Sequence, residues 1–330
     1  MSVLVVIPCL NEAAHLERLL AQFLSDSEVE RIVVADGGSD DGSQAIVETY
    51  TQRDGRVHLL HNEARIQSAG VNLAVARFGE GMKWLLRVDA HCIYPDNYAQ
   101  ILLASARERK AGAVVVPMLT VGRKGFQLAV AAAQNSALGT GGSAHRSVTQ
   151  GAFVDHGHHA LIRLDVFQRV GGYCESMVCN EDAELDYRLT QAGERIWLEP
   201  KARITYLPRE TVASLARQYF KYGKGRADNV KRHRLRPRLR QLIPLAVPLA
   251  IAALPLALLH PIFALPLMGW LALCLLGGAI IGWRSDTGKW ALLAGVAAAV
   301  MHAAWAAGFL KNYVFSKRLD EPRYGLLESS

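Results

Sequence analysis

Three stretches of the chain place polar side chains where chemistry could occur, and the first is LLRVDAHCIYP (85–95). Its apolar, strand-forming run ends in Asp89 and His91, which point to the same side of an extended segment. Buried polar groups cost stability unless something pairs with them. A carboxylate and an imidazole can coordinate Mg²⁺ or Mn²⁺ when phosphate oxygens and water fill the shell. A strand-end turn with a solvated His91 explains the pair equally well.

The second stretch, GGSDDGS, follows the apolar run RIVVAD (31–36). Asp36 at the strand end can accept a hydrogen bond from a base or a ribose, and the glycines would let the backbone approach such a ligand. A tight turn capped by Asp36 also fits these residue types. Taken alone, this stretch favours the turn.

The third stretch, NEDAELDYRLTQAG (180–193), begins a predicted helix that Asn180 caps. Its first turns carry four acids, Glu181, Asp182, Glu184 and Asp186. The helix dipole favours acids at this end, so most of them need no further role. Asp182 in the first turn can face a cleft, whereas Asp186 lies one turn deeper. We expect Asp186 to pair with a base such as Arg188 or to be solvated.

The segment between 139 and 163 combines glycine and histidine. GTGGSAHRSVTQG (139–151) lacks the Lys-Ser/Thr ending of a phosphate loop, and a mobile loop over the site is the favoured interpretation. The run 153–163 is predicted to be a strand along which His156, His158 and His159 alternate. Their spacing is not that of a zinc site, so structural roles or ligand contacts are favoured.

The elements that must position these residues alternate between strand and helix. Continuous apolar runs predict buried strands at 2–8, 31–36, 57–61, 83–89 and 111–119. Helices are predicted after Asn11, which can cap the first of them, and at 66–78, 96–108 and 211–227. This alternation predicts an α/β fold with a Rossmann-like, mostly parallel sheet. Ligands bind such sheets beyond the carboxyl ends of the strands, where Pro8–Glu12, Asp36–Ser43 and Asp89–His91 all lie.

The C-terminal part of the chain differs in composition. Of the 330 residues, 242–283 and 290–310 are almost uncharged, and a helix of about 20 residues spans a bilayer. We expect 242–260, 262–283 and 290–310 to be embedded in lipid, the first, proline-rich segment either crossing or lying in the interface. Lys311, Lys317 and Arg318 favour a cytoplasmic C-terminus, which requires an even number of crossings. Met1 leads directly into a strand, so we expect no secretion signal.

The net charge of +7 is concentrated beside this tail. Nine Lys and Arg residues stand between Lys221 and Arg240, against one acid, Asp228. A basic segment next to a membrane span marks the cytoplasmic side and attracts anionic lipid heads. No zinc-finger spacing, RNP motif or stacking pattern supports a nucleic-acid partner. The five scattered cysteines are typical of reduced packing residues in a cytosolic setting.

Together these motifs resemble the inverting family 2 glycosyltransferases with a GT-A fold. VVIPCLNE is similar to the family's P-x-x-N-E start, and VVADGGSDDGS resembles its V-D-D-G-S-x-D-G-T turn. VDAH stands where the family carries a D-x-D metal motif, and NEDAELDYRL looks like the block that holds its catalytic base. VDAH, GTGGSAHR, VDHGHHALIR and RQYFKYGKGR, followed by a short hydrophobic tail, resemble the succinoglycan-biosynthesis-type membrane glucosyltransferases. The resemblance covers about residues 3–315.

The resemblance implies roles for individual residues. Asp182 is the expected catalytic base, and Asp89 and His91 are the expected ligands of a Mg²⁺ or Mn²⁺ ion. The residues expected to bind the nucleotide-sugar are Pro8, Asn11, Glu12, Asp36, Gly38, Ser39, Asp41, Arg65 and Asp89. Those expected to contact the acceptor or the diphosphate are His158, Glu181, Gln218, Lys221 and Arg226. Gly37 and His91 replace aspartates of the family pattern, and the missing Trp of a Q-x-x-R-W motif argues against a long-chain synthase.

The resemblance also implies an activity and a location. The expected enzyme moves a sugar, glucose in β linkage, from a UDP-sugar to a lipid-diphosphate-linked oligosaccharide in exopolysaccharide synthesis. The chain is expected to begin with a cytoplasmic GT-A domain at 1–240, which has a nucleotide-binding half at about 1–120 and an acceptor half at about 121–240. A membrane tail of two or three helices at 241–312 follows, and then a polar tail at 313–330. Its partners are the lipids of a bacterial-type inner membrane. One alternative is a polyprenyl-phosphate sugar transferase. The other is a non-catalytic membrane-bound nucleotide-sugar-binding module, and the retention of Asp89 and Asp182 disfavours this second alternative.

Overall fold

The computed structural model describes residues 2–141, 150–177, 179–236, 239–285, 288–316 and 324–326. The chain divides into two compact units. The first unit comprises Met1–Met118, Val148–Thr205 and Asp320–Ser330, and the second comprises Leu119–Ser147 and Tyr206–Leu319. The loop expected at 139–151 falls largely on 142–149, outside the described residues.

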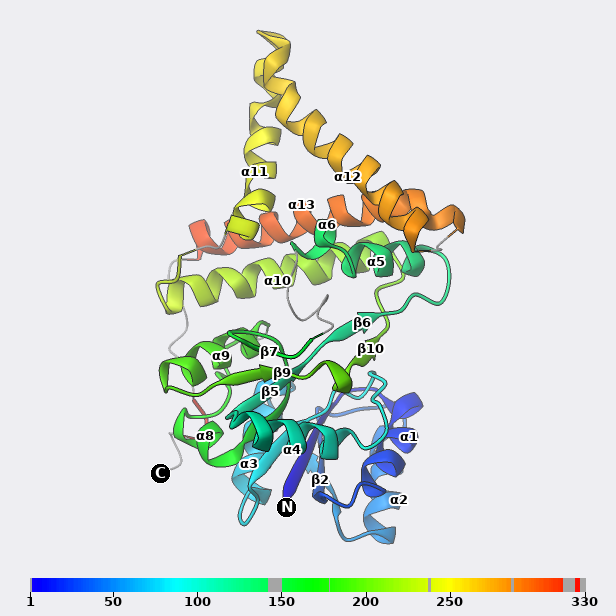
Figure 1. Cartoon of the computed structure of the whole chain (residues 1–330), viewed down its shortest axis with the longest axis vertical. Helices are drawn as coiled ribbons and strands as arrows, with labels where there is room; N and C mark the ends of the chain where they lie inside the picture. Colours follow the sequence, from blue (N-terminus) through cyan, green and yellow to red (C-terminus); the bar gives the residue numbers. More distant parts are fainter. Residues whose placement is uncertain are drawn as a thin grey trace. The chain divides into compact units, whose positions relative to one another are not determined.

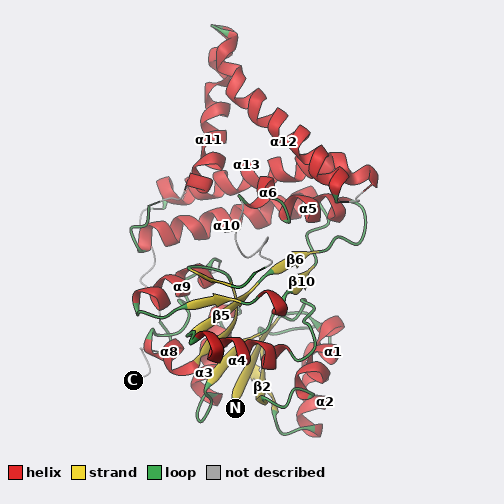
Figure 2. Ribbon diagram, in the orientation of Figure 1, coloured by secondary structure: helices red, strands yellow, loops and turns green. Residues whose placement is uncertain are grey.

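A sheet forms the centre of the first unit, and its eight described strands follow the order β3-β2-β1-β4-β8-β5-β9-β7. The strands are β1 Val3–Cys9, β2 Val29–Asp36, β3 Val57–His61, β4 Trp84–Arg87, β5 Ala113–Val116, β7 Ala152–Val154, β8 His158–Arg163 and β9 Ile196–Leu198. β1 pairs in parallel with β2 and β4, β2 with β3, and β5 with β9, whereas β8 and β7 run antiparallel to their neighbours. The predicted mostly parallel α/β sheet is confirmed (Figure 2).

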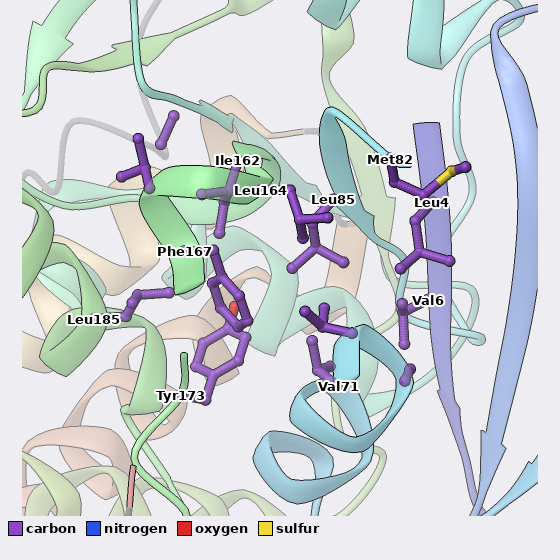
Figure 3. Close-up of a cluster of buried hydrophobic side chains, with 14 of the residues drawn as sticks. Leu4, Val6, Val71, Met82, Leu85, Ile162, Leu164, Phe167, Tyr173 and Leu185 are labelled. Carbon is purple, nitrogen blue, oxygen red and sulfur yellow. The ribbon is translucent and has the colours of Figure 1, made fainter. Parts of the chain in front are cut away.

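Helices connect the strands of the first unit and pack against the sheet (Figure 1). They are α1 Ala13–Leu24, α2 Ser43–Arg53, α3 Gln67–Phe78, α4 Tyr98–Arg109, α8 Leu164–Arg169, α9 Glu181–Gln191 and the short η1 Pro200–Ala202. Every residue of β1 is buried, as its uninterrupted apolar run predicts for a strand covered on both faces. The core cluster in Figure 3 joins β1, β4 and α3 to the segment that carries Phe167 and Tyr173.

Two predicted strands are broken in the structure. The run at 111–119 divides into β5 and β6 (Met118–Thr120) at Pro117, which has no N–H to donate to a strand ladder. The run at 153–163 divides into β7 and β8, so His156 lies in a turn and the predicted alternation of histidines along one strand is wrong. β8 inserts antiparallel between β4 and β5, a position that the order of strands along the chain does not reveal.

The second unit is mostly helical among its described residues. Its helices are α5 Phe126–Gln134, α6 Ala137–Thr140, α10 Val212–Arg232, α11 Leu239–Ala253, η2 Leu254–Leu258, η3 Pro261–Ala264, α12 Leu265–Arg284, η4 Gly288–Trp290 and α13 Ala291–Phe315. β6 pairs with β10 (Ile204–Tyr206) in a separate two-stranded sheet, and the unit boundaries at Met118 and Thr205 fall within these two strands. Within the described residues, three segments are long and apolar enough to cross a membrane: Gln241–Leu258, Pro261–Arg284 and Leu293–Phe315. They overlap the three segments that the sequence predicts.

Candidate active site

The carboxyl ends of β1, β2 and β4 meet at one edge of the sheet. Cys9, the last residue of β1, is in register with Asp36, the last residue of β2. On its other side β1 pairs with β4, where Val6 is in register with Arg87. The turns that follow these strands therefore start side by side, which brings together the three strand ends that the sequence singles out.

Hydrogen bonds between main chain and side chains lock the turns after β1 and β2 together. Asn11 N donates to Ser39 Oγ at 2.8 Å, and Asn11 Oδ1 accepts from Asp40 N at 3.0 Å. Asp41 Oδ2 accepts from the first backbone N–H of α1 at 2.9 Å. The prediction that Asn11 caps α1 is wrong, because Glu12 holds the N-cap position and Asn11 joins the two turns in a left-handed conformation, with φ of 58°.

Asp36 is buried, and the turn and helix that follow it donate hydrogen bonds to both oxygens of its carboxylate. Oδ2 accepts from the backbone N–H groups of Gly38 and Ser39 at 2.8 and 3.0 Å and from Gln44 Nε2 at 2.8 Å, while Oδ1 accepts from Ser39 Oγ at 2.5 Å. Burial raises the pKa of the Asp36 carboxyl, but these hydrogen bonds outweigh it and hold the pKa below its usual range. The capped turn is therefore present, and a base or ribose would share the Asp36 oxygens with it.

Arg65 borders the same turn. Gly38 has a φ of 87°, and a Cβ built on it would lie 3.4 Å from Arg65 Nη2, so the guanidinium is close to the turn backbone. The Arg65 side chain is exposed, and a guanidinium in that position suits an anionic ligand. Pro8 is buried within β1, so it contributes to the packing of this sheet edge and is not exposed to a ligand.

A buried arginine on β4 organises the deepest part of the site. Arg87 Nη1 donates to Asp182 Oδ1 at 2.6 Å and to the Tyr173 hydroxyl at 3.2 Å, and Nη2 donates to Gln67 Oε1 at 2.8 Å. Nη2 also lies 3.3 Å from Glu181 Oε1. The Arg87 side chain is only 5% exposed, so solvent screens these contacts weakly.

Arg87 gives the two neighbouring carboxylates of α9 different surroundings. Asp182 Oδ1 also accepts from the Tyr173 hydroxyl at 3.0 Å, so two donors fix one of its oxygens, and no donor among the described residues contacts Oδ2. Burial raises the pKa of Glu181 to about 7, with Arg87 lowering it and Asp182 raising it further. Burial lowers the pKa of Arg87 itself, but Asp182 and its neighbours outweigh this and keep the guanidinium charged.

Asp89 lies between Arg87 and a histidine of β8. Its Oδ1 is 3.5 Å from Arg87 Nη2, and its Oδ2 is 3.5 Å from His158 Nε2. Burial raises the pKa of the Asp89 carboxyl, but Arg87, His158 and His91 outweigh burial and hold the pKa below its usual range. His91 is 42% exposed, and its Nδ1 lies 3.0 Å from Glu12 Oε1. The structure therefore places an ionised carboxylate and a half-exposed imidazole at the end of β4.

The donor set at this edge fits a divalent cation that takes most of its ligands from a substrate. Asp89 and His91 offer a carboxylate oxygen and an imidazole nitrogen, which Mn²⁺ and Mg²⁺ both accept. In the described part of the chain, no group of three or more His, Cys, Asp or Glu side chains is placed to hold a metal ion. Asp89 and His91 alone would therefore need further ligands from a substrate or water to hold a cation.

The acids deeper in α9 have structural partners. Asp186 is buried; its Oδ2 lies 2.6 Å from His156 Nδ1. Arg188 pairs with Glu184, with 2.6 Å between Nη2 and Oε2. The expectation that Asp186 pairs with Arg188 or is solvated is wrong, because the turn between β7 and β8 supplies a closer partner. Asp186 thus fixes the turn that leads into His158.

Three of the expected contact residues, Gln218, Lys221 and Arg226, lie on α10 of the second unit. Gln218 Nε2 donates to the hydroxyls of Tyr206 and Tyr222 at 2.9 and 3.0 Å. Lys221 is exposed. Their contacts with an acceptor or a diphosphate remain predictions.

Sequence reasoning missed Arg87, Tyr173 and Gln67 as parts of the site. The available signal was a cation inside WLLR, a run otherwise typical of a buried strand, because arginine is almost never fully buried unless it is paired. Tyr173 and Gln67 carry no comparable local signal. Their roles depend on packing against Arg87.

Similarity to known proteins extends over most of the chain. Residues 4–171 match the family model described as Glycosyl transferase family 2. The chain is 49% identical over 322 residues to the succinoglycan biosynthesis protein ExoA of Rhizobium meliloti (strain 1021), covering 96% of each protein. It is 30% identical over 118 residues to the glycosyltransferase GlyG of Streptococcus pneumoniae serotype 4, covering 34% of this chain and 37% of that protein. Its fold is similar to that of the mannosyltransferase PcManGT from Pyrobaculum calidifontis, solved in complex with GDP-Man and Mn²⁺, with a TM-score of 0.62 and 20% identity over 96% of this chain and 88% of that one.

Arg87→Met should destabilise the protein, because it leaves Asp182 and its neighbours, whose side chains are 13–17% exposed, as carboxylates without their cation. Removing one partner of a buried ion pair typically lowers the free energy of unfolding by about 3–5 kcal/mol. Denaturant titration in detergent measures this loss. Arg163→Met is the matched control, since its partner Asp165 is exposed and a surface pair contributes roughly 0–1 kcal/mol. A loss no larger than that of the control would show that Arg87 does not hold the cluster.

Glu181 predicts a pH dependence of stability. Its folded pKa of about 7 lies above the ordinary value of 4.5, so the folded state binds this proton more tightly than the unfolded chain does. The Glu181 contribution to the free energy of unfolding should therefore fall as the pH rises from 4.5 to about 7, and then level off. Glu181→Gln should remove this part of the slope in unfolding titrations across that range. Identical slopes in the parent and the variant would contradict the assignment.

Proposed function

Because the chain belongs to glycosyl transferase family 2, we propose that this glycosyltransferase moves a sugar from a UDP-sugar to a lipid-diphosphate-linked oligosaccharide, with inversion at the anomeric carbon. In this proposal the sugar is glucose, the new linkage is β, and the product belongs to exopolysaccharide synthesis. The relative named for succinoglycan biosynthesis, 49% identical over 96% of both proteins, supports the pathway. The observation that carries the mechanism is the fixed carboxylate of Asp182 beside Arg87.

Asp182 acts as the general base. Arg87 and Tyr173 hold its Oδ1 by hydrogen bonds, which leaves Oδ2 to act on the acceptor. Oδ2 takes the proton from the acceptor hydroxyl as that oxygen attacks the anomeric carbon. The bond from this carbon to the diphosphate oxygen breaks on the opposite face, so the configuration inverts. His158 and Glu181, which contact Asp89 and Arg87, border the space for the acceptor.

The donor binds along the interlocked turns after β1 and β2. Asn11, Ser39 and Asp41 shape these turns through their mutual hydrogen bonds, and Asp36 meets the base with oxygens that it shares with its own turn. The exposed guanidinium of Arg65 beside Gly38 suits the negative charge of a nucleotide diphosphate. We assign the nucleotide-binding half to about 1–120 and the acceptor half to about 121–240.

In this proposal Asp89 and His91 would hold a Mg²⁺ or Mn²⁺ ion. The bound ion would offset the negative charge that develops on the leaving diphosphate. Glu12 beside His91 and His158 beside Asp89 orient the two ligands, as partners of metal ligands commonly do. The low pKa of Asp89 keeps its carboxylate ionised at neutral pH, which ligation requires.

A lipid-linked acceptor accounts for the apolar helices of the second unit. They would anchor the enzyme in a bacterial-type inner membrane, with the catalytic residues facing the cytoplasm. The basic residues of α10, including Lys221 and Arg226, suit the phosphates of the acceptor or the anionic heads of membrane lipids.

Turnover of a panel of UDP- and GDP-sugars with native membrane lipids tests this function. UDP-glucose should label a lipid-diphosphate-linked product. Asp182→Asn should lower kcat by roughly 10²–10⁴, the range typical of acid–base groups, while donor affinity stays nearly constant. Labelled sugar recovered in the lipid extract measures the rate.

Asp165→Asn is the matched control for this substitution. It makes the same carboxyl-to-amide change at an exposed side chain of α8 and should turn over like the parent. An Asp182→Asn protein that folds and keeps the parental rate would show that another residue is the base. A lipid monophosphate product would instead identify a polyprenyl-phosphate sugar transferase.

The metal assignment predicts that Asp89→Ala abolishes metal-dependent donor binding as well as turnover. His91→Asp should keep part of both, because it restores the carboxylate pair of the D-x-D motif. Calorimetric titration of the UDP-sugar, with Mn²⁺ and with EDTA, measures the binding. Donor binding that is insensitive to EDTA, or unchanged in Asp89→Ala, would exclude this metal site.

A further inference from the structure

Of the three apolar segments in the second unit, α13 differs from the others in its surroundings. Between residues 293 and 310, Ala307 is the one described residue that is exposed. Helices α5, α10, α11 and α12 all pack against α13 (Figure 1). The apolar window of α13 is 44% buried, against 11% for each of the other two segments, so α13 presents less surface to lipid than they do.

α13 runs beside α10 for most of the length of α10. Near the start of α10, Leu215 and Met301 share a core cluster. Midway, Gly223 lies so close to the α13 backbone that a Cβ on it would collide. At the far end, Lys231 Nζ donates to the backbone carbonyl of Asn312 at 2.6 Å. The environment of α10 is therefore also that of α13.

The charges of α10 keep this helix pair out of hydrocarbon. Its basic residues are Arg217, Lys221, Lys224, Arg226, Lys231 and Arg232, and its acid is Asp228. The contact with α13 is itself polar at one end, because Asn312 Nδ2 donates to Asp228 Oδ1 at 2.6 Å. Charged side chains inside a bilayer are costly, and this set is far larger than one ion pair can compensate. A helix packed along α10 therefore stays outside the hydrocarbon.

Tyr324, which follows α13 in the chain, contacts residues of the first unit. Tyr324 forms an isolated antiparallel bridge with Cys174, and its hydroxyl donates to Glu184 Oε1 at 3.4 Å. The Tyr324 ring centroid also lies 4.6 Å from Arg188 Cζ. These partners precede every apolar segment in the chain. Both ends of the apolar region must then lie on the same side of a membrane, which requires an even number of crossings.

α11 and α12 have the features of an inserted pair. They connect through η2 and η3, and Figure 1 shows them meeting at a shared tip. Their apolar side chains face outward, with Leu249 71% and Leu276 67% exposed. The 20 residues of α12 give a length of about 30 Å, close to the thickness of the hydrocarbon core. Pro244 and Pro248 lie inside α11, and membrane helices tolerate internal proline.

We propose that α11 and α12 enter the bilayer as a helical hairpin, while α13 stays at the membrane surface on the side of the first unit, held there by α10. Lipid covers the outward apolar faces of the hairpin. The sequence predicts two or three membrane helices, and the proposed hairpin corresponds to two. The inference rests on the membrane association in the proposed function and is independent of the reaction.

Cysteine labelling of the full-length chain in membranes tests this topology. The background is Cys179→Ser, since the other described cysteines are buried. Single cysteines replace three exposed residues, Gln52 on α2, Ser285 after α12 and Phe315 at the end of α13. A membrane-impermeant maleimide is applied to inverted and to right-side-out vesicles. Gln52→Cys, Ser285→Cys and Phe315→Cys should all react in vesicles of the same orientation.

Every topology in which α13 crosses gives a different pattern. If all three apolar segments cross, Phe315→Cys reacts from the face opposite to Gln52→Cys. If α12 and α13 are the crossings, Ser285→Cys reacts from that opposite face. Either result overturns the proposal. Alkaline carbonate should leave the parent chain in the membrane, and its release would contradict the membrane association itself, so the two failures are distinguishable.

Discussion

The guanidinium of Arg87, buried at the end of β4, is the charge on which the geometry of the site depends. It donates hydrogen bonds to Gln67 on α3, to Asp182 on α9 and to Tyr173, which precedes α9. These partners lie 20, 95 and 86 residues away along the chain. A buried cation is tolerated only where such partners surround it. The need to satisfy one side chain therefore fixes how α3, α9 and the Tyr173 segment approach the sheet, and the same contacts orient the carboxylate of Asp182.

The cluster around Arg87 is nevertheless short of positive charge. Three described carboxylates, those of Asp89, Glu181 and Asp182, lie within 3.5 Å of one guanidinium. Glu181 has a pKa of about 7, so near neutral pH it is protonated in part of the molecules and removes only part of the excess negative charge. Part of the remaining negative charge is the carboxylate of Asp89, whose Oδ2 lies 3.5 Å from His158 Nε2. This excess of negative charge is the physical reason for the divalent cation in the proposed function.

Local signals in the sequence sufficed for strands β1 to β4 and for the strand end that carries Asp36, whereas the runs at 111–119 and 153–163 each divide into two strands. Continuous apolar runs predict buried strands, and the turn residues after Asp36 predict the capped turn that the structure contains. The partners of the site residues could not be predicted in the same way. His158 reaches Asp89 because β8 inserts antiparallel beside β4, and His156 reaches Asp186 because a turn interrupts the predicted strand. Such contacts depend on strand order and register, which no single segment encodes.

Composition suggests that α13 spans the membrane, whereas its packing suggests that it does not, and the difference has a physical reason. Hydropathy counts the side chains of one helix, so α13 ranks with α11 and α12. Its neighbour α10 carries six Lys and Arg residues, and each costs roughly 2.5–3.5 kcal/mol at the centre of a bilayer. Moving the pair into hydrocarbon would cost on the order of 15 kcal/mol or more, as much as the whole folding stability of a typical domain. A helix surrounded by protein also needs an apolar surface on every side. A long uncharged run therefore describes a buried helix as well as a membrane-spanning one, and the helix beside it decides between them.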